Sequence, residues 1–186
     1  MRVIAGKRGH LNLLAPEGME TRPTTDRIKE TLFNILQFDV VEAEFLDLFS
    51  GSGQMGIEAL SRGASHCTFV EKDRKACEII NKNLTSTDLL SDSTLLGENV
   101  FDALRGFSRD KKFDIIFMDP PYAMHEESEI LKLIKEFNIC DENSIIIIEA
   151  DKKRTLDFID INVFSLEKQK IYKTNQHIFL KLKKEK

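Results

Sequence analysis

The residues with the clearest chemical potential are Asp119, Pro120, Pro121 and Tyr122, which directly follow the apolar run FDIIFM. Two consecutive prolines fix φ and restrict the residue before them, so this turn is stiff. A rigid Asp-Pro-Pro turn presents a carboxylate oxygen and a backbone carbonyl side by side, and these two acceptors match the hydrogens of an NH2 group. Tyr122 adds a flat face on which a base can stack, which contributes about 1–3 kcal/mol.

The predicted Asp119 turn offers what methyl transfer to the exocyclic amine of a base requires. Such an amine is a poor nucleophile because its lone pair is delocalised into the ring. Acceptors placed on its hydrogens favour the pyramidal amine and stabilise the positive charge that develops during in-line transfer. Near-attack geometry could supply as much as ~7–11 kcal/mol of the barrier. Asp119 need not act as a general base, because the methylated amine can lose its proton to water.

A second candidate site is a glycine turn, in which Gly51, Gly53 and Gly56 complete a G-x-G-x-x-G pattern between a predicted strand and a predicted helix. Glycine permits a sharp turn and lets a ligand approach the backbone closely. Glu71 follows at the end of the next predicted strand, at about the ~20-residue distance where an acid binds ribose hydroxyls. Each charged hydrogen bond of this kind contributes roughly 1.5–3 kcal/mol. The pattern predicts a cofactor that contains adenosine.

Nicotinamide dinucleotides and S-adenosylmethionine both contain adenosine, and residues before the glycines favour the latter. Asp47 would repel a pyrophosphate but would suit the cationic methionine end of S-adenosylmethionine. Phe49 and Ser50 also separate the strand from the glycines, whereas dinucleotide-binding folds usually pass straight from strand to glycine. Asn99, which closes the third predicted strand, is placed either to reach the adenine edge or to cap the next helix.

The elements that must position these residues alternate between strand and helix. Strands are predicted at 45–49, 66–71, 94–99, 113–119 and 144–150, and the last of them is apolar on both faces, as a central parallel strand must be. The chain then ends in VFSLEKQKIYKT and HIFLKLKK with a Thr-Asn-Gln connection, which predicts an antiparallel hairpin. The fold class is therefore α/β: a doubly wound, mostly parallel seven-stranded sheet with an antiparallel C-terminal hairpin.

The N-terminal part predicts a β-hairpin over residues 2–14, then a helix that Thr24 or Thr25 caps. We expect a single domain over 1–186, with an N-terminal hairpin extension at 1–20 and a catalytic α/β core at 21–186.

Composition excludes several classes of protein. The 186 residues are 41% hydrophobic and 31% charged, without an apolar run near the ~20 residues that cross a bilayer and without a signal-peptide pattern. We therefore expect a cytoplasmic protein that does not contact a membrane. Cys67, Cys77 and Cys140 form no CxxC pair, so we expect buried, reduced thiols and no metal site.

The formal charge of −4 argues against nonspecific coating of nucleic acid, yet basic residues gather locally. Arg2, Lys7 and Arg8 lie in an N-terminal segment without acids, which predicts either an RNA-binding edge or a solvated segment. Further cations cluster at 152–154 and along the C-terminal strand.

Several motifs together resemble one family. FSGSGQMGIEALSRGA (49–64), DPPY (119–122), TRPTTDRIKETLFNIL (21–36) and the opening RVIAGKRGHLNLLAP (2–16) are similar to the RsmD-type class I methyltransferases, which modify guanine N2 in 16S ribosomal RNA. The resemblance spans nearly the whole chain. Lys29 is a departure, since the family often has arginine at this position.

The resemblance implies S-adenosylmethionine as cofactor and a Rossmann-like class I methyltransferase fold. It implies that Asp119 to Tyr122 hold a flipped guanine, that the N-terminal cations Arg2, Lys7 and Arg8 touch ribosomal RNA, and that the substrate is a small-subunit assembly intermediate. We also expect a monomer. The cofactor-binding residues that it implies are Asp47, Gly51, Gly53, Glu71 and Asn99, with Arg22 and Asp26 in the segment that covers the pocket.

The sequence leaves four alternative functions open. Another RNA amino-methyltransferase or a DNA adenine or cytosine amino-methyltransferase can use the same chemistry. The DNA enzymes usually carry a target-recognition insertion, for which this chain has no room. Glutamine methyltransferases that act on release factors have Asn where Asp119 stands. A nicotinamide-dependent dehydrogenase would need a catalytic His or Tyr–Lys pair that the sequence does not suggest. A non-catalytic RNA-binding protein would not depend on Asp119.

Overall fold

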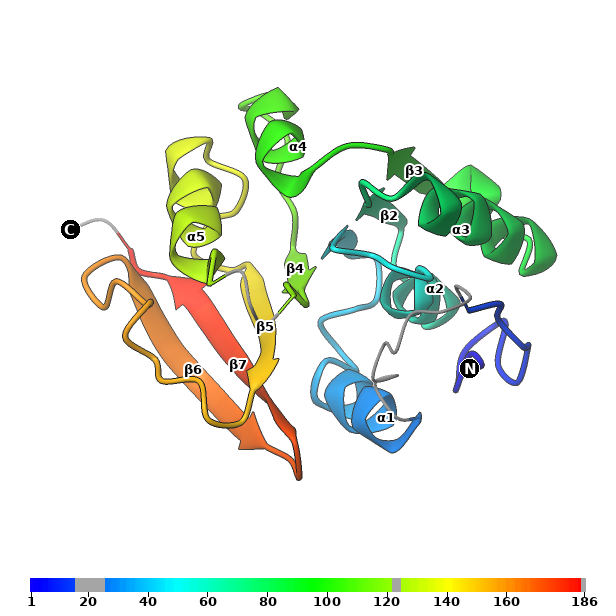
Figure 1. Cartoon of the computed structure of the whole chain (residues 1–186), viewed down its shortest axis with the longest axis horizontal. Helices are drawn as coiled ribbons and strands as arrows, with labels where there is room; N and C mark the ends of the chain where they lie inside the picture. Colours follow the sequence, from blue (N-terminus) through cyan, green and yellow to red (C-terminus); the bar gives the residue numbers. More distant parts are fainter. Residues whose placement is uncertain (16–25, 122–124, 185–186) are drawn as a thin grey trace.

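A seven-stranded sheet in the order β3-β2-β1-β4-β5-β7-β6 forms the centre of the computed structural model, which describes residues 1–15, 26–121 and 125–184 (Figure 1). Strands β1 to β5 are parallel, whereas β7 runs antiparallel to both β5 and β6. The predicted doubly wound α/β architecture with an antiparallel C-terminal hairpin is thus confirmed. The strands are β1 (Glu44–Leu48), β2 (His66–Val70), β3 (Ser93–Leu96), β4 (Ile115–Met118), β5 (Ile145–Asp151), β6 (Phe164–Ile171) and β7 (Asn175–Leu182).

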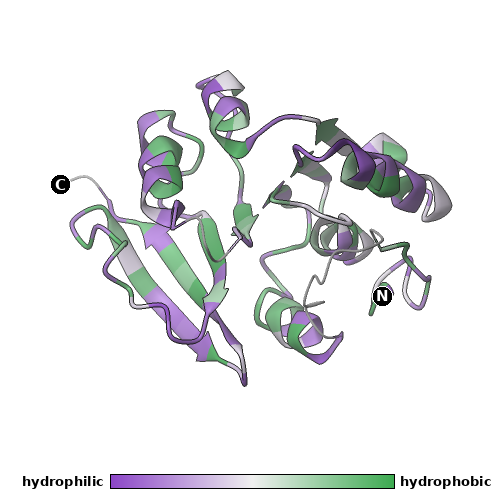
Figure 2. Ribbon diagram, viewed as in Figure 1, coloured by the Kyte–Doolittle hydropathy of each residue, from purple (hydrophilic) through white to green (hydrophobic). Residues whose placement is uncertain are grey.

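Helices cover both faces of this sheet. One buried cluster joins one face of the strands to α1, α2 and α3, and the other joins the opposite face to α4 and α5. Hydrophobic residues accordingly dominate the central strands, while the outward helix surfaces are hydrophilic (Figure 2). The helices are α1 (Asp26–Ile35), α2 (Gln54–Ser61), α3 (Arg74–Ser86), the 3-10 turn η1 (Leu90–Asp92), α4 (Val100–Gly106) and α5 (Glu127–Glu136).

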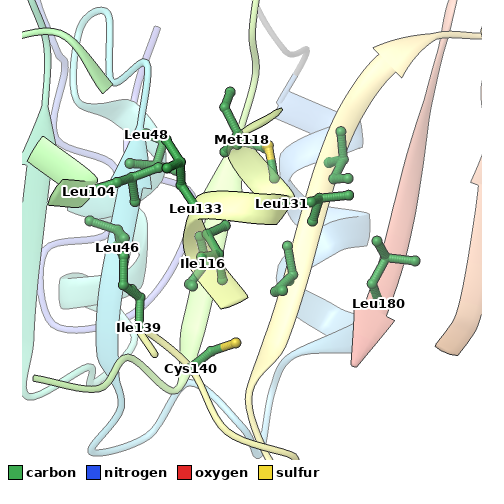
Figure 3. Packing of buried hydrophobic residues seen from close by; sticks show 14 of the residues in the cluster. Leu46, Leu48, Leu104, Ile116, Met118, Leu131, Leu133, Ile139, Cys140 and Leu180 are labelled. Carbon is green, nitrogen blue, oxygen red and sulfur yellow. The ribbon is translucent and has the colours of Figure 1, made fainter. Parts of the chain in front are cut away.

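Alternate residues of the central strands serve the two cores, because successive side chains of a strand point to opposite faces. Leu46 of β1 lies in register with Ile116 of β4, which lies in register with Ile146 of β5. Leu46 and Ile116 pack with Leu104 of α4 and Leu133 of α5 (Figure 3). This explains why β4 and β5 are apolar almost throughout: both of their faces are buried.

The order of the strands reverses between β1 and β4. From β1 the chain builds outward through β2 and β3, and from β4 it builds in the other direction. Ligands of open α/β sheets bind in the crevice at such a switch point, outside the carboxyl ends of the strands. The glycine turn follows β1 and Asp119 follows β4, so both predicted sites lie at this crevice.

The turn of the C-terminal hairpin differs from the prediction. The backbone N–H of Tyr172 donates to the carbonyl of Asn175 at 2.8 Å, so residues 172–174 form the turn and the expected Thr-Asn-Gln connection is wrong. Asn175 and Gln176 belong to β7 because hydrogen bonds hold their side chains. Asn175 donates to Glu149, and Gln176 donates to the carbonyl of Asp151 at the end of β5 and to that of Arg154 beyond it.

The N-terminal segment is less regular than the predicted hairpin. Its pairing is one antiparallel bridge, Arg2 to Asn12, flanked by three backbone hydrogen bonds. The reason is that the segment docks on α2 instead: the N–H of Lys7 donates to the Ser61 carbonyl at 2.7 Å. At Gly6 (φ 85°) the approach is so close that a Cβ would lie 1.9 Å from that oxygen. Thr24 and Thr25, the predicted caps of α1, lie outside the described residues.

Glu58 of α2 is the buried anchor of this N-terminal packing. Its side chain is 0% exposed and accepts hydrogen bonds from the N–H groups of Ile4 (2.7 Å) and Ala5 (3.1 Å) and from Arg62 Nε (2.7 Å). Lys29 of α1, also 0% exposed, lies 3.4 Å from the same carboxylate. Burial lowers the pKa of Lys29, and the attraction of Glu58 opposes this effect. The pair therefore joins α1, α2 and the N-terminal segment.

None of the helices in the described ranges is both long and apolar enough to span a bilayer. Cys67 and Cys140 are buried free thiols, as expected, whereas Cys77 is half-buried. The division of the chain into a 1–20 extension and a 21–186 core stays a prediction.

Candidate active site

The glycine turn combines an open side with a packed side. Gly51 and Gly53 have positive φ angles of 56° and 77°, which glycine adopts without strain. A Cβ added at Gly51 would meet nothing within 4 Å, so space is open above this residue. At Gly56 a Cβ would lie 2.3 Å from the Phe69 ring. The first glycine thus leaves room for a ligand, and the third lets α2 pack against β2.

Phe49 and Ser50 make the connection between β1 and this turn. Phe49 has a φ of 62°, and such strain in a residue other than glycine tends to occur at functional sites. The Ser50 hydroxyl donates to the Asp47 carbonyl at 2.6 Å and accepts the N–H of Val70 at 3.0 Å. These two bonds fix the turn to both β1 and β2.

Glu71, directly after β2, faces the glycine turn. Its Oε2 accepts the N–H of Gly51 at 2.9 Å, and its Oε1 accepts the N–H of Asp73 at 2.8 Å. An ionised carboxylate has about four acceptor positions, so Glu71 can still accept hydroxyl groups. The thiol of Cys77 donates to the Glu71 carbonyl at 3.2 Å.

Asp47 lies under the glycine turn and is only 1% exposed. Its Oδ2 accepts the N–H of Gly56 at 3.0 Å. Burial raises the pKa of Asp47 to about 7; the hydrogen bond from Gly56 opposes this shift and the charge of Glu71 adds to it. No basic side chain within the described part of the chain forms an ion pair with Asp47. A buried carboxylate without a positive partner suits a cationic ligand.

Asp119 follows β4 and lies opposite Glu149, because Met118 and Ile148 are in register. The alternation of side chains places both on the same face as Phe117 and Asp47. Burial raises the pKa of Asp119 well above its usual value, and the charges of Glu149 and Asp47 raise it further. The described residues contain no ion-pair partner for Asp119. Asp47, Asp119 and Glu149 thus form a row of carboxylates across β1, β4 and β5.

The rest of the Asp119 turn is partly described. Pro120 is buried and Pro121 is exposed. Tyr122, the predicted stacking surface, lies outside the described residues. Its role stays a prediction.

Glu149 and His177 are site residues that the sequence analysis did not identify. His177 is fully buried, and its Nε2 lies 3.1 Å from Glu149 Oε2. Asn175 donates to the other oxygen of Glu149, and the Tyr172 hydroxyl lies 3.4 Å from His177 Nδ1. The available signal was that Glu149, like Asp119, is an acid at the end of an apolar strand. His177 could not be found in this way, because it depends on the pairing of β5 with β7.

Asn99 caps helix α4, one of the two roles predicted for it. Its Oδ1 accepts the N–H of Asp102 at 3.0 Å and so caps α4. Its predicted contact with adenine stays a prediction. Asp26 begins α1 at an exposed position, where it pairs with Arg2, and Arg22 lies outside the described residues.

The three predicted RNA-binding cations are already paired with acids. Arg2 Nε lies 2.9 Å from Asp26, Lys7 Nζ lies 3.4 Å from Asp92, and an Arg8 nitrogen lies 2.7 Å from Asp88. RNA would have to displace these partners. Contact between this segment and RNA stays a prediction.

Comparison with known proteins connects this geometry to one family. The family model described as conserved hypothetical protein 95 matches residues 1–181. A Bacillus subtilis protein assigned as an rRNA methyltransferase is 40% identical over 154 residues, which cover 82% of this chain and 84% of the relative. The ribosomal RNA small subunit methyltransferase D of Haemophilus influenzae is 38% identical over 159 residues, 84% of this chain and 81% of that protein.

The fold agrees with these relatives. A solved Escherichia coli structure assigned to a methyltransferase superposes with a TM-score of 0.86 at 31% identity, covering 98% of this chain and 97% of that one. The predicted class I methyltransferase fold is therefore confirmed. The chain belongs to the ribosomal RNA small subunit methyltransferase D family.

Proposed function

We propose that this protein transfers a methyl group from S-adenosylmethionine to the exocyclic N2 amine of a guanosine in 16S ribosomal RNA. One observation carries the proposal: Asp119 and the glycine turn lie at the same switch-point crevice, and neither Asp119 nor Asp47 below the glycine turn has an ion-pair partner among the described residues. The family supports small-subunit ribosomal RNA as substrate. The assignment of guanine N2 as the methylated position rests on the resemblance of the sequence motifs to those of the family.

The residues of the crevice fit S-adenosylmethionine, which supplies an activated methyl group when bound. The opening above Gly51 admits a ligand to the backbone, and Glu71 offers acceptors for ribose hydroxyls. Asp47 offers negative charge to the cationic methionine end. The same charge would repel the pyrophosphate of a dinucleotide, which disfavours a nicotinamide-dependent oxidoreductase. Asn99, Arg22 and Asp26 complete the proposed set around the cofactor.

Asp119 would act on the amine of the substrate. Its carboxylate accepts one hydrogen of the amine while the carbonyl of the rigid Pro-Pro turn accepts the other, so that the nitrogen lone pair is aimed at the methyl group. The neighbouring charges of Asp47 and Glu149 favour the positive charge that develops on the amine. Tyr122 would stack on the base. These groups orient the amine and stabilise its charge, and the proton leaves afterwards to water.

We propose a monomer in the cytoplasm that acts on a small-subunit assembly intermediate. The net charge of −4 supports the particle as substrate, because a chain with this charge has weak general attraction for naked RNA.

The test uses labelled S-adenosylmethionine with small subunits from cells that lack this methyltransferase. We expect label in one nucleoside, identified as N2-methylguanosine after digestion, and more label in particles than in free 16S RNA. Label in adenosine or cytidine, or none, would contradict the proposed reaction.

The affinity for S-adenosylmethionine should depend on pH through Asp47. Its pKa is 3.8 in the unfolded chain and about 7 in the free folded protein, so below pH 7 the folded protein holds Asp47 protonated. A cationic ligand favours the ionised form, and binding therefore releases this proton. We expect calorimetry to show affinity rising by up to about tenfold per pH unit between pH 5 and 7 and levelling above.

The Asp47→Asn variant is the matched control, because it keeps the size of the side chain but cannot ionise. Its affinity should be lower at pH 8 and nearly flat across the same range. An unchanged pH profile in this variant would remove Asp47 from the cofactor site.

A further inference from the structure

The charge of the chain is divided unevenly along the sequence. Residues 1–151 contain 17 lysines and arginines against 27 acids, whereas residues 152–186 contain ten against four. The negative total therefore conceals a basic C-terminal part, which consists of the loop after β5 and the β6–β7 hairpin. Such asymmetry within one chain is typical of proteins that bind nucleic acid.

Four of these lysines lie close to the turn of the hairpin. Because β6 runs antiparallel to β7, and β7 antiparallel to β5, the end of β6 lies at the carboxyl edge of the sheet. Lys152 follows β5 there, and its N–H donates to the Thr174 carbonyl of the hairpin turn at 3.2 Å. All four side chains are exposed. The hairpin-tip lysines are Lys152, Lys153, Lys170 and Lys173.

The hairpin-tip lysines flank the candidate active site. Lys170 lies in register with His177, which lies in register with Glu149, the neighbour of Asp119. The distance from β4 to β6 is three strand spacings, roughly 14 Å. Lys153 also lines a surface pocket with His125, a residue that closely follows the Asp119 turn in sequence. A nucleotide held at Asp119 would thus have its neighbours along the strand within reach of this surface.

These lysines differ from the basic residues of the N-terminal segment. None of the four forms an ion pair within the described residues, whereas Arg2, Lys7 and Arg8 each do. Arg154, next in sequence, pairs with the buried Glu127 at 3.2 Å and stacks on Phe158, so its role is structural. The acid nearest in sequence, Asp151, accepts the N–H of Lys153. Unpaired exposed ammonium groups are the form in which lysine binds phosphate.

We propose that the hairpin-tip lysines bind the phosphate backbone of the RNA on either side of the target nucleotide. This inference rests on the proposed function, since it takes the strand held at Asp119 to be RNA. It assigns RNA affinity to the C-terminal hairpin. The surface positions the strand without reading its sequence, because phosphate contacts carry no base information.

The test compares two variants with equal loss of charge. One replaces all four hairpin-tip lysines with glutamine; the other replaces Lys75, Lys82, Arg109 and Lys132, which are exposed and without ion pairs in the described chain. Binding of transcribed 16S RNA is measured by fluorescence anisotropy from 50 to 200 mM salt. Each lost phosphate contact lowers the salt slope by about 0.7–0.9. Exposed substitutions of this kind leave stability nearly unchanged, which thermal melting verifies.

We expect the hairpin-tip variant to bind RNA at least about tenfold more weakly at 100 mM salt, with a slope lower by about 2–3. In methyl transfer its KM for RNA should rise while kcat holds, the pattern of lost uniform binding. Equal Kd and slope in the two variants would overturn the inference. Binding is read without methyl transfer, so this result does not depend on turnover. A wild type that binds RNA through these lysines but methylates none contradicts the proposed function alone.

Discussion

Replacing Asp119 with alanine is expected to reduce methyl transfer by roughly 10²–10³-fold or more, toward background, while S-adenosylmethionine still binds. The substitution removes the acceptor that orients the amine and stabilises its developing charge. It leaves the glycine turn and Glu71 untouched, because they follow β1 and β2 while Asp119 follows β4. The measurements are single-turnover rates with labelled S-adenosylmethionine and calorimetric titration of the cofactor.

The control for this experiment is Asp110→Ala, an exposed acid shortly before β4, which should behave as the wild type. Removing Asp119 also relieves repulsion from Asp47 and Glu149, so the variant should be at least as stable as the wild type. Activity within a few-fold of the wild type would contradict the role of Asp119. Activity lost together with cofactor affinity would assign Asp119 to cofactor binding.

Replacing Glu58 with alanine is expected to lower the free energy of unfolding by about 3–5 kcal/mol, because it leaves the buried ammonium group of Lys29 without its carboxylate partner. The N–H groups of Ile4 and Ala5 lose their acceptor as well, so the N-terminal segment should detach from α2. Urea denaturation followed by circular dichroism gives the free energy, and hydrogen exchange reports the detachment.

Two variants calibrate this second result. Lys29→Met leaves Glu58 with Arg62 as counter-ion at 2.7 Å and should cost less than Glu58→Ala. Glu78→Ala, which removes an exposed acid 3.9 Å from Arg74, should change stability by under about 0.5 kcal/mol. A loss below 1 kcal/mol in Glu58→Ala, or a larger loss in Lys29→Met, would show that the carboxylate is not the anchor.

The strands and the two site segments could be predicted from the sequence because local patterns determine them. An apolar run bounded by turn residues marks β4 wherever its neighbours lie, and the glycine pattern after β1 needs only its own spacing. The parallel sheet then brings the ends of β1, β2 and β4 together, so Asp47, Glu71 and Asp119 lie at the same edge of the sheet.

The features that could not be predicted depend on contacts between distant segments of the chain. The N-terminal segment is not a regular hairpin, because the carboxylate of Glu58, more than fifty residues away in the sequence, accepts hydrogen bonds from its N–H groups. The hairpin turn lies earlier in the sequence than predicted, because the Asn175 side chain donates a hydrogen bond to Glu149 on β5 and so belongs to β7. The acids that pair with Arg2, Lys7 and Arg8 come from α1 and from the region around η1, so these ion pairs could not be predicted either. Local spacing contains no information on these partners.

The three thiols differ in burial and therefore in their expected rates of alkylation. Burial raises the pKa of Cys67 well above its usual value and that of Cys140 to about 11, so both resist alkylating reagents until the protein unfolds. Cys77 is half-buried and bonded to the backbone of Glu71. A reagent applied to the native protein therefore labels Cys77 first, beside the proposed ribose-binding residue Glu71, and the rate of labelling follows local opening of the chain around Glu71.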